Sequence, residues 1–283
     1  MWLGRSRYPA RARRAFLPGD PPRRRAPAGA PMPDGFAVSG GTAPRRTIAP
    51  DDVELWWTAL TGECAPDDRR VLAAAELDRS TRFGTAAFAN DFIRIRATLR
   101  RVLGAYTGIA PEALEFTTGV HGKPELLGHA LQFNLTHTTG CAVVAVAGSG
   151  AVGVDIESLD TDFDQMALAT RVLTPGEADL VRADRRRFLH HWVAKESYLK
   201  WLGSGLTISP DTLELGADAS GHTVVTGVDG AALPVGYVHR FGLSPRHVGA
   251  FVSHRPARRF PLRPTESAGA RAYFGRRSAG VQA

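Results

Sequence analysis

Few cysteines and no long apolar run limit what this chain can be. Two cysteines, Cys64 and Cys141, cannot build a disulfide framework, which indicates a reducing compartment such as the cytosol. The longest apolar stretch, CAVVAVAG at residues 141–148, is far shorter than the about eighteen residues of a membrane-spanning helix. The N-terminal region has no continuous apolar segment of the secretory type. We therefore expect a cytoplasmic globular protein.

Lysine and acidic residues are nearly absent from both ends of the chain. Residues 1–50 contain ten arginines, no lysine and two aspartates, for a net charge of +8. Residues 256–283 contain six arginines and one glutamate, for +5. Because the formal charge of the whole chain is +7, residues 51–255 carry −6. The basic balance therefore belongs to two tails, 1–50 and 256–283, that we predict to be disordered.

Three interpretations of the first tail stay open. Its many arginines and few acids are typical of an organellar transit peptide, although serine is sparse and the prolines would break an amphipathic helix. A translation start at Met32 would explain the segment equally well. A nucleic-acid-binding arm is the third, but no aromatic residues alternate with the arginines to stack on bases.

Helical and extended patterns alternate twice between residues 51 and 255. Helices are predicted over residues 67–79 and 85–107, and a helical block over 162–203 with a helix start at Thr174-Pro175. Because the strands come in runs, we predict an α+β fold of two similar lobes, 51–150 and 151–255, related by duplication. The predicted strands are 114–118, 131–137, 141–147, 151–157, 211–215, 222–228, 235–241 and 247–253.

The segment GSGAVG at residues 148–153 matches the glycine pattern of dinucleotide-binding folds. In those folds the motif opens a helix, whose N-terminus binds the pyrophosphate. Here a second extended segment, AVGVDIE, follows at once. We therefore predict a turn between two strands.

Carboxylates at alternate positions mark the next segment, GVDIE. Asp155 and Glu157 project from the same face of a strand, so their charges repel unless the face is solvated or a cation lies between them. Both interpretations stay open. If a cation binds, Mg²⁺ is the natural ion, because it takes carboxylate oxygens and completes its shell with water and phosphate oxygens.

Two further segments carry groups suited to phosphate, and a third places acidic and basic side chains on one helix face. FNLTHT places His137 between two threonine hydroxyls, and HGKP sets Lys123 in a turn. WVAKESYLK is helical in pattern, so Trp192 lies beside Glu196, and Glu196 beside Lys200. The alternative interpretation of each is structural: an ordinary histidine, an exposed turn, and a surface salt bridge next to a core anchor.

Taken together, these residues resemble a known family. GVDIE followed by W-x-x-K-E-x-x-x-K, starting at residues 153 and 192, is the signature pair of the 4′-phosphopantetheinyl transferases. The apparent duplication, GKP and FNLTHT make the chain similar to the two-lobed Sfp-type enzymes. The resemblance covers roughly residues 67–254. It implies that coenzyme A binds in the cleft between the lobes, with Mg²⁺ on its pyrophosphate.

The resemblance also implies roles for individual residues. Asp155, Glu157 and Glu196 match the metal-binding carboxylates. The basic and polar matches to coenzyme-binding residues are Lys200 near the pyrophosphate, His137 with Thr136 at the phosphates, and Lys123 with Arg79 toward the 3′-phosphate end. Asn90 and Asp91 depart from the pattern, because relatives often carry a basic residue there.

By the same resemblance, the activity is transfer of the 4′-phosphopantetheine group of coenzyme A to a serine of an apo acyl or peptidyl carrier protein. The base that deprotonates the serine is Glu196 or Lys200, and the pattern does not choose between them. We expect a monomer. The alternatives are a nucleic-acid-binding protein acting through its tails and a generic Mg²⁺-dependent nucleotide hydrolase. For carrier docking the densest basic cluster is Arg182, Arg185, Arg186 and Arg187.

Overall fold

The computed structural model describes residues 45–119, 121–161, 165–181, 184–228 and 233–265. Most of both predicted tails, 1–44 and 266–283, therefore lies outside the described residues. Apart from short 3₁₀ turns, each half follows the same order within the described residues: one strand, three helices and four strands. The first half comprises β1 (Val53–Ala59), α2 (Pro66–Arg70), α3 (Ala74–Ser80), α4 (Ala86–Thr107), β2 (Phe116–Thr118), β3 (Pro124–Leu126), β4 (Gln132–Thr138) and β5 (Cys141–Ala147). The second comprises β6 (Val152–Ser158), α5 (Gln165–Val172), α6 (Pro175–Val181), α7 (Arg185–Leu202), β7 (Leu213–Ala217), β8 (Thr223–Gly227), β9 (Gly236–Phe241) and β10 (His247–Ser253).

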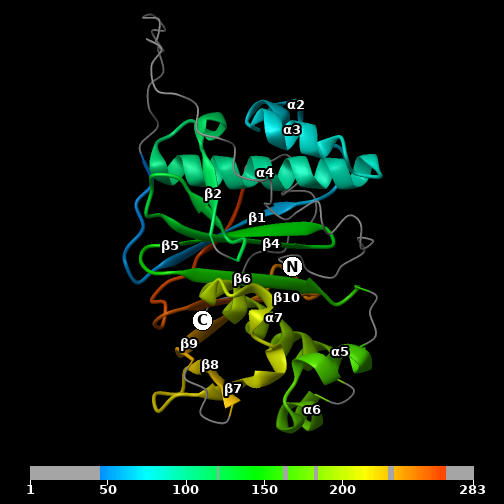
Figure 1. Ribbon diagram of the computed structural model, residues 1–283, viewed down its shortest axis with the longest axis vertical. Helices are drawn as coiled ribbons and strands as arrows, with labels where there is room; N and C mark the ends of the chain where they lie inside the picture. The colour runs from blue at the N-terminus through cyan, green and yellow to red at the C-terminus, as the bar shows by residue number, and fades with distance from the viewer. Residues whose placement is uncertain (1–44, 120, 162–164, 182–183, 229–232, 266–283) are drawn as a thin grey trace, which may run out of the picture.

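These elements stack as helix, sheet, sheet and helix (Figure 1). The first sheet has the order β11-β1-β5-β4, where β11 is Leu262–Pro264, and the second has the order β6-β10-β9-β8-β7. The same antiparallel pairing recurs in each, β1 with β5 and β6 with β10. The α+β class is therefore confirmed. The shared order of elements supports the duplication of two lobes, which stays a prediction.

A continuous apolar core lies between the two sheets. It includes Leu55 of β1, Val143 of β5, Val154 of β6 and Phe251 of β10, all fully buried. Alternate side chains of the same strands face outward into separate cores beneath α4 and α7. Strand β5 is apolar on both faces for this reason, which explains its unbroken hydrophobic run. The two halves thus share a buried interface.

Polar residues and glycines end the two long helices. The side chain of Thr85 accepts a hydrogen bond from the first turn of α4, and Gly108, at φ 74°, ends that helix. In α7 the same positions are taken by Asp184 and by Gly203 at φ 69°. The helix predicted over residues 85–107 is therefore confirmed.

The single helix predicted over residues 67–79 is wrong, because α2 and α3 are separate. Each has its own N-terminus, where an acid in the first turn accepts a hydrogen bond from the N-cap backbone. Asp68 accepts from Ala65 at 3.0 Å, and Glu76 accepts from Ala73 at 2.9 Å. Two such starts eight residues apart cannot lie in one helix. The predicted block over 162–203 likewise contains three helices, with α6 starting at Pro175 as predicted.

The glycine segment 148–153 connects strands of different sheets. β5 ends at Ala147, Gly150 lies at φ 63°, and β6 begins at Val152. The predicted turn between two strands is therefore confirmed, and no helix follows the glycines directly. This turn carries the chain from the first layer of strands to the second.

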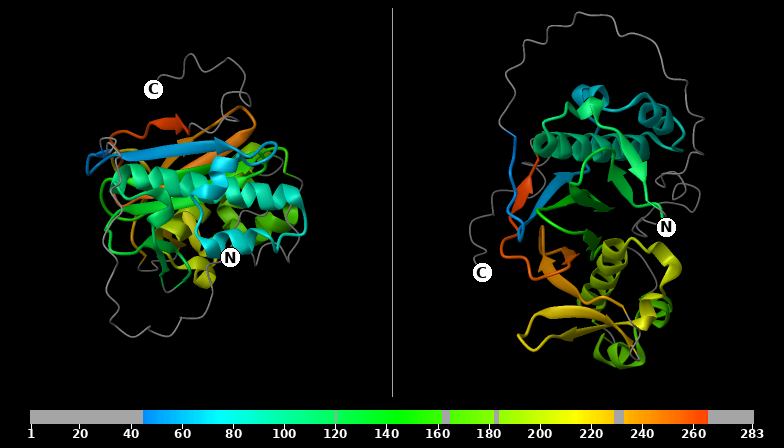
Figure 2. Two further views of the ribbon diagram at one scale, coloured as in Figure 1. Left: turned by 90° about the horizontal axis from the view of Figure 1, so that it is seen from above. Right: turned by 60° about the vertical axis from the view of Figure 1, so that its left-hand side comes forward.

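The boundary predicted for the C-terminal tail at residue 256 is wrong. Residues up to Thr265 return to the first half, where β11 pairs in parallel with β1 (Figure 2). The backbone of β1 donates from Val53 to Arg259 and from Leu55 to Pro261, each at 3.0 Å. An uncovered edge of β1 would leave these groups unpaired, so the short strand completes the sheet.

Candidate active site

Strand β4 lies beside β6, the edge strand of the other sheet (Figure 1), and its side chains form hydrogen bonds to β6. Asn134 accepts a hydrogen bond from the backbone N–H of Val154 at 2.9 Å. Thr136 and Thr138 occupy the next two alternate positions and donate to the side chains of β6. This row of side chains joins the two sheets where no backbone ladder does.

The two carboxylates of β6 face that row. Thr136 donates to Oδ1 of Asp155 at 2.9 Å, and Thr138 donates to Oε2 of Glu157 at 3.1 Å. The predicted placement of both carboxylates on one face is therefore confirmed. Asp155 is only 2% exposed and Glu157 only 4%. The alternative of a solvated strand face is therefore wrong.

Lys200 of α7 completes this polar cluster. Its ammonium donates to Oδ1 of Asp155 at 2.6 Å, to the carbonyl of Val154 at 3.1 Å and to the hydroxyl of Thr136 at 3.3 Å. The side chain is buried. Lys200 thus belongs to a buried ion pair rather than to the surface salt bridge of the structural interpretation.

Close packing of α7 on β6 brings Lys200 to this position. A Cβ atom at Gly153 would lie 2.1 Å from the carbonyl oxygen of Ser197 and 2.3 Å from the backbone nitrogen of Trp201. Only glycine therefore lets the helix approach the strand this closely. The first residue of GVDIE serves the helix contact, and the acids that follow serve the site.

Glu157 differs from an ordinary carboxylate in its proton affinity. Burial, and then the negative charge of Asp155, raise the pKa of Glu157 to about 8. Hydrogen bonds from Thr138 and Trp192 and the charge of Lys200 oppose this rise. Two acids and one ammonium share a buried space, so a further cation would stabilise the ionised form of Glu157.

The donor set fits a hard cation. Among the described residues Oδ2 of Asp155 is buried without a hydrogen-bond partner. Glu196 is half-buried on α7, one turn before Lys200. Within the described part of the chain, no three histidine, cysteine or acidic side chains lie close enough to hold a metal ion by themselves. Mg²⁺ is typically held by one or two carboxylates together with substrate phosphates, which suits an incomplete protein shell.

A pocket of about 190 Å³ is lined by residues of α3, α4, β2, β3 and β4. Arg79 and His137, both expected to contact the coenzyme, line it together. Two aromatic rings contribute: the guanidinium of Arg79 lies 5.7 Å from the ring of Phe92, and that of Arg96 lies 4.9 Å from Phe116. The remaining lining residues are Glu76, Ile95, Thr117, Thr118, Gly122, Pro124, Asn134 and Leu135.

His137 lines the pocket, and Lys123 contacts the start of β6. Burial, and then the charge of Lys200, lower the pKa of His137 to about 4, so its ring is neutral at neutral pH. Lys123 is half-buried and donates to the carbonyl of Val152 at 3.0 Å. Burial lowers the pKa of Lys123 to about 8, against the opposing charge of Glu125. Its neighbours in the turn line the pocket, whereas Lys123 points toward β6.

Sequence patterns did not identify Arg96 as a site residue. Arg96 lies on the α4 face that carries Phe92, and it forms an ion pair with Glu76 of α3. Arg100 binds the same carboxylate at 2.6 Å. Arg96 could have been found as a charged residue in register with the apolar stripe of a helix. Arg96 supplies basic charge from α4, the helix in which Asn90 and Asp91 depart from the family pattern.

Lys195, in the same motif as Lys200, has a structural role. It is fully buried, forms an ion pair with Glu177 of α6 and donates to the carbonyl of Val172 at 2.8 Å. Glu177 also accepts from the backbone of Leu215 at 3.0 Å. Burial lowers the pKa of Lys195, while Glu177 opposes that effect. The pair therefore fixes α7 against α6 and β7.

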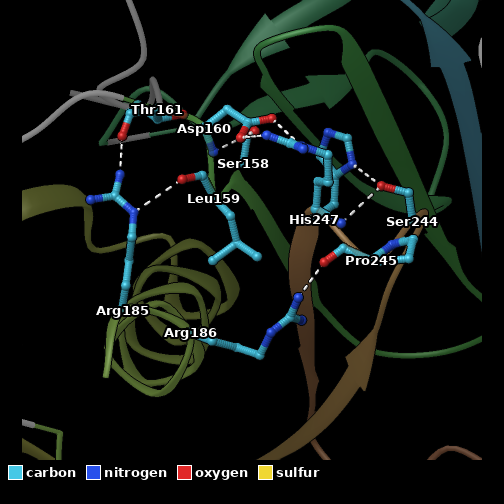
Figure 3. Close-up of polar contacts among 10 residues, drawn as sticks. Ser158, Leu159, Asp160, Thr161, Arg185, Arg186, Ser244, Pro245 and His247 are labelled. Atoms are coloured by element: carbon cyan, nitrogen blue, oxygen red, sulfur yellow. Dashed lines mark hydrogen bonds and ion pairs between the residues drawn. The ribbon is translucent and has the colours of Figure 1, made fainter. Parts of the chain in front are cut away.

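The arginines at the start of α7 hold nearby loops (Figure 3). Arg185 donates to the carbonyls of Leu159, at 3.1 Å, and of Thr161. Arg186 donates to the carbonyl of Pro245. Arg182 lies outside the described residues. Part of the cluster predicted for carrier docking thus joins the end of β6 and the turn before β10 to the helix.

Proteins of known function are similar to this chain in sequence. The family model described as the 4′-phosphopantetheinyl transferase superfamily matches residues 151–242. The 4′-phosphopantetheinyl transferase HetI of Nostoc sp. is 33% identical over 175 residues, which cover 58% of this chain and 73% of HetI. This chain belongs to the 4′-phosphopantetheinyl transferase superfamily. A 4′-phosphopantetheinyl transferase of Bacillus subtilis is 29% identical over 129 residues, 44% of this chain and 56% of that protein.

Within this phosphopantetheinyl transferase, the matched region holds Asp155, Glu157, Glu196 and Lys200. The pocket residues Arg79 and His137 precede that region, so their roles rest on the geometry and the resemblance. In the described part of the chain no helix is long and apolar enough to cross a membrane.

Proposed function

We propose that this phosphopantetheinyl transferase moves the 4′-phosphopantetheine group of coenzyme A to a serine of an apo acyl or peptidyl carrier protein. The other product is 3′,5′-ADP. The observation that carries the proposal is the buried cluster of Asp155, Glu157 and Lys200 beside a basic and aromatic pocket. Anionic charge on a diphosphate is matched by such a combination of cations and cation-binding acids.

The pocket suits the nucleotide end of coenzyme A. Arg79 and Arg96 supply positive charge for the 3′-phosphate, and the ring of Phe116 offers an apolar surface for the base. Neutral His137 lies at the β4 edge of this pocket, and Lys123 lies near the start of β6. The pyrophosphate would then lie toward Lys200 and the carboxylates.

Asp155, Glu157 and Glu196 are the residues that would hold Mg²⁺. When bound, the ion would neutralise charge on the diphosphate and so favour departure of the nucleotide. The unpartnered Oδ2 of Asp155 and the high proton affinity of Glu157 support this assignment. Lys200 would add a fixed positive charge at the same diphosphate.

In the reaction, the serine oxygen attacks the β-phosphorus, and the bond from that phosphorus to the oxygen bridging the two phosphates breaks. The serine proton goes to a base, and the bridging oxygen leaves with 3′,5′-ADP. Lys200 is held as a hydrogen-bond donor to three oxygens, so its nitrogen has no free lone pair. This favours half-buried Glu196 as the base that accepts the proton.

The wider assignment is also part of the proposal. We place the chain among the two-lobed Sfp-type enzymes, with lobes at residues 51–150 and 151–255 and β11 completing the first. Because both lobes belong to one chain, a monomer would suffice for activity. We expect it to act in the cytosol.

Intact mass spectrometry tests the function directly. The full chain is incubated with coenzyme A, Mg²⁺ and individual apo carrier proteins, and a carrier should gain one phosphopantetheine group. Replacing the acceptor serine of that carrier with alanine should prevent the gain. Consumption of coenzyme A without any carrier would favour the nucleotide hydrolase instead.

A further inference from the structure

Two hydroxyls from the first lobe contact the two carboxylates of the second. We propose that Thr136 and Thr138 are positioning residues, which orient Asp155 and Glu157 for a divalent cation. The inference rests on the proposed cation-binding role of these carboxylates. In this proposal the threonine hydroxyls bind the two acids and not phosphate. The contact between β4 and β6 is then needed for cation binding.

When Glu157 is ionised, as a bound cation requires, the hydrogen-bond directions at Thr138 allow a single arrangement. Its oxygen accepts from the backbone N–H of Ser158 at 3.2 Å. A hydroxyl has one proton, and that proton is directed to Glu157 Oε2 at 3.1 Å. Thr138 is 2% exposed, so water does not compete for it.

The hydroxyl of Thr136 is directed in the same way, but the group that donates to it is different. The ammonium of Lys200 can only donate, and it lies 3.3 Å from the Thr136 oxygen. The hydroxyl proton is therefore directed to Oδ1 of Asp155, at 2.9 Å. With Oδ1 engaged by both groups, Oδ2 is left as the oxygen without a partner among the described residues.

Threonine is suited to this task by its stiffness. Its branched Cβ restricts χ1, so a buried threonine holds its hydroxyl in one direction at low entropic cost. Two buried carboxylates at alternate strand positions repel, and each would rotate away from the other without a fixed donor. The hydroxyls of Thr136 and Thr138 therefore set the directions in which the two carboxylates point.

Asn134 allows the joining of the two sheets to be tested apart from the positioning of the acids. It belongs to the same row of β4 side chains, but it binds the backbone of Val154 and touches neither carboxylate in this network. Loss of its side chain should weaken the contact between the strands without disturbing the carboxylates. It therefore provides a control on the same strand.

The test is Mn²⁺ binding to the full chain with coenzyme A present, because substrate phosphates complete the cation's shell. Binding is measured from the electron paramagnetic resonance signal of free Mn²⁺ and compared with coenzyme A alone. Thr136→Val and Thr138→Val should each weaken binding by about ten- to a hundredfold, the usual cost of losing a group that orients a metal ligand. Thr136→Ser and Thr138→Ser should stay near wild type. Asn134→Ala and the remote buried Thr107→Val, on α4, should also bind Mn²⁺ normally.

Thermal melts show which variants are folded. If a valine variant does not fold, the alanine and serine variants at that position replace it, because they differ in the hydroxyl and little in bulk. Wild-type affinity in folded valine or alanine variants would overturn the positioning role, and so would serine variants as weak as valine. Failure of the wild type to bind Mn²⁺, or unchanged binding by Asp155→Asn, would instead overturn the proposed cation role, and the inference with it.

Discussion

The ammonium nitrogen of Lys200 lies 2.6 Å from Oδ1 of Asp155, and both side chains are buried. This ion pair joins α7 to β6, the strand of the second sheet that lies beside β4 of the first. Forming a buried ion pair costs desolvation energy. Removing one partner leaves the other charge buried and unpaired, which destabilises the fold. Both residues are also proposed to act at the diphosphate, so the same ion pair contributes to the stability of the fold and to the site.

Removing one partner should destabilise the fold more than removing both. Lys200→Met leaves Asp155 buried and unpaired, so the free energy of unfolding should fall by about 3–5 kcal/mol. The double variant Asp155→Asn/Lys200→Met should recover part of this loss. Urea unfolding with EDTA present measures each value. Arg171→Met, at an exposed cation, should change stability by less than about 0.5 kcal/mol. Additive losses in the double variant would contradict the coupling.

Glu196→Gln should abolish proton transfer while keeping the fold. The substitution preserves shape on a half-buried helix position, and loss of a general base typically lowers kcat by about a hundredfold or more. Carrier modification followed by mass spectrometry gives the rate, and Glu112→Gln, an exposed acid, serves as the control. Near-normal turnover in the folded Glu196 variant would point to Lys200 as the base.

Coenzyme A affinity should fall as pH rises through about 8. Lys123, whose pKa is lowered to about 8, is cationic below that value and attracts phosphate, and it is neutral above it. Calorimetry from about pH 6.5 to 9.5 should show this loss when saturating Mg²⁺ keeps Glu157, whose pKa is also about 8, ionised. Under those conditions Lys123→Met should bind more weakly at the acid end and show no step near pH 8.

His137 provides the contrast for that pH series. With a pKa of about 4, its ring is neutral over the whole range, so His137→Gln should keep the step near pH 8. A step that survived in Lys123→Met would assign it to another group and remove Lys123 from the coenzyme site.

Truncation after His254 should destabilise the first sheet. It removes β11, the backbone bonds to β1 and the ring of Phe260, which lies 5.3 Å from that of Phe251. A loss of about 2–3 kcal/mol would lower Tm by roughly 4–12 °C in a chain of this size. Truncation after Thr265 is the matched control, since it keeps every contact of β11 described here. Equal melting of both truncations would show that the strand adds nothing to stability.

Local signals in the sequence predicted much of the fold. The Thr174 and Glu177 side chains cap α6 reciprocally, at 3.3 and 3.0 Å, as the Thr-Pro-Gly-Glu pattern indicates. The alternation in GVDIE placed both acids on one face, and the apolar period predicted α4. These succeeded because each depends on residues within one or two turns of each other. The prediction of a single helix over 67–79 was wrong because this segment contains two N-terminal caps, and the apolar pattern alone does not show where one helix ends and the next begins.

The sequence by itself determined the long helices, most strands, the shared face of Asp155 and Glu157, and the family resemblance. Only the tertiary structure decided which groups those acids meet. Thr138 lies nineteen residues from Glu157, Lys200 lies forty-five from Asp155, and β11 pairs with a strand at the start of the described chain. Such contacts depend on how two sheets pack and in which register their edge strands meet. No local propensity encodes that register, because it is set by the apolar core between the layers.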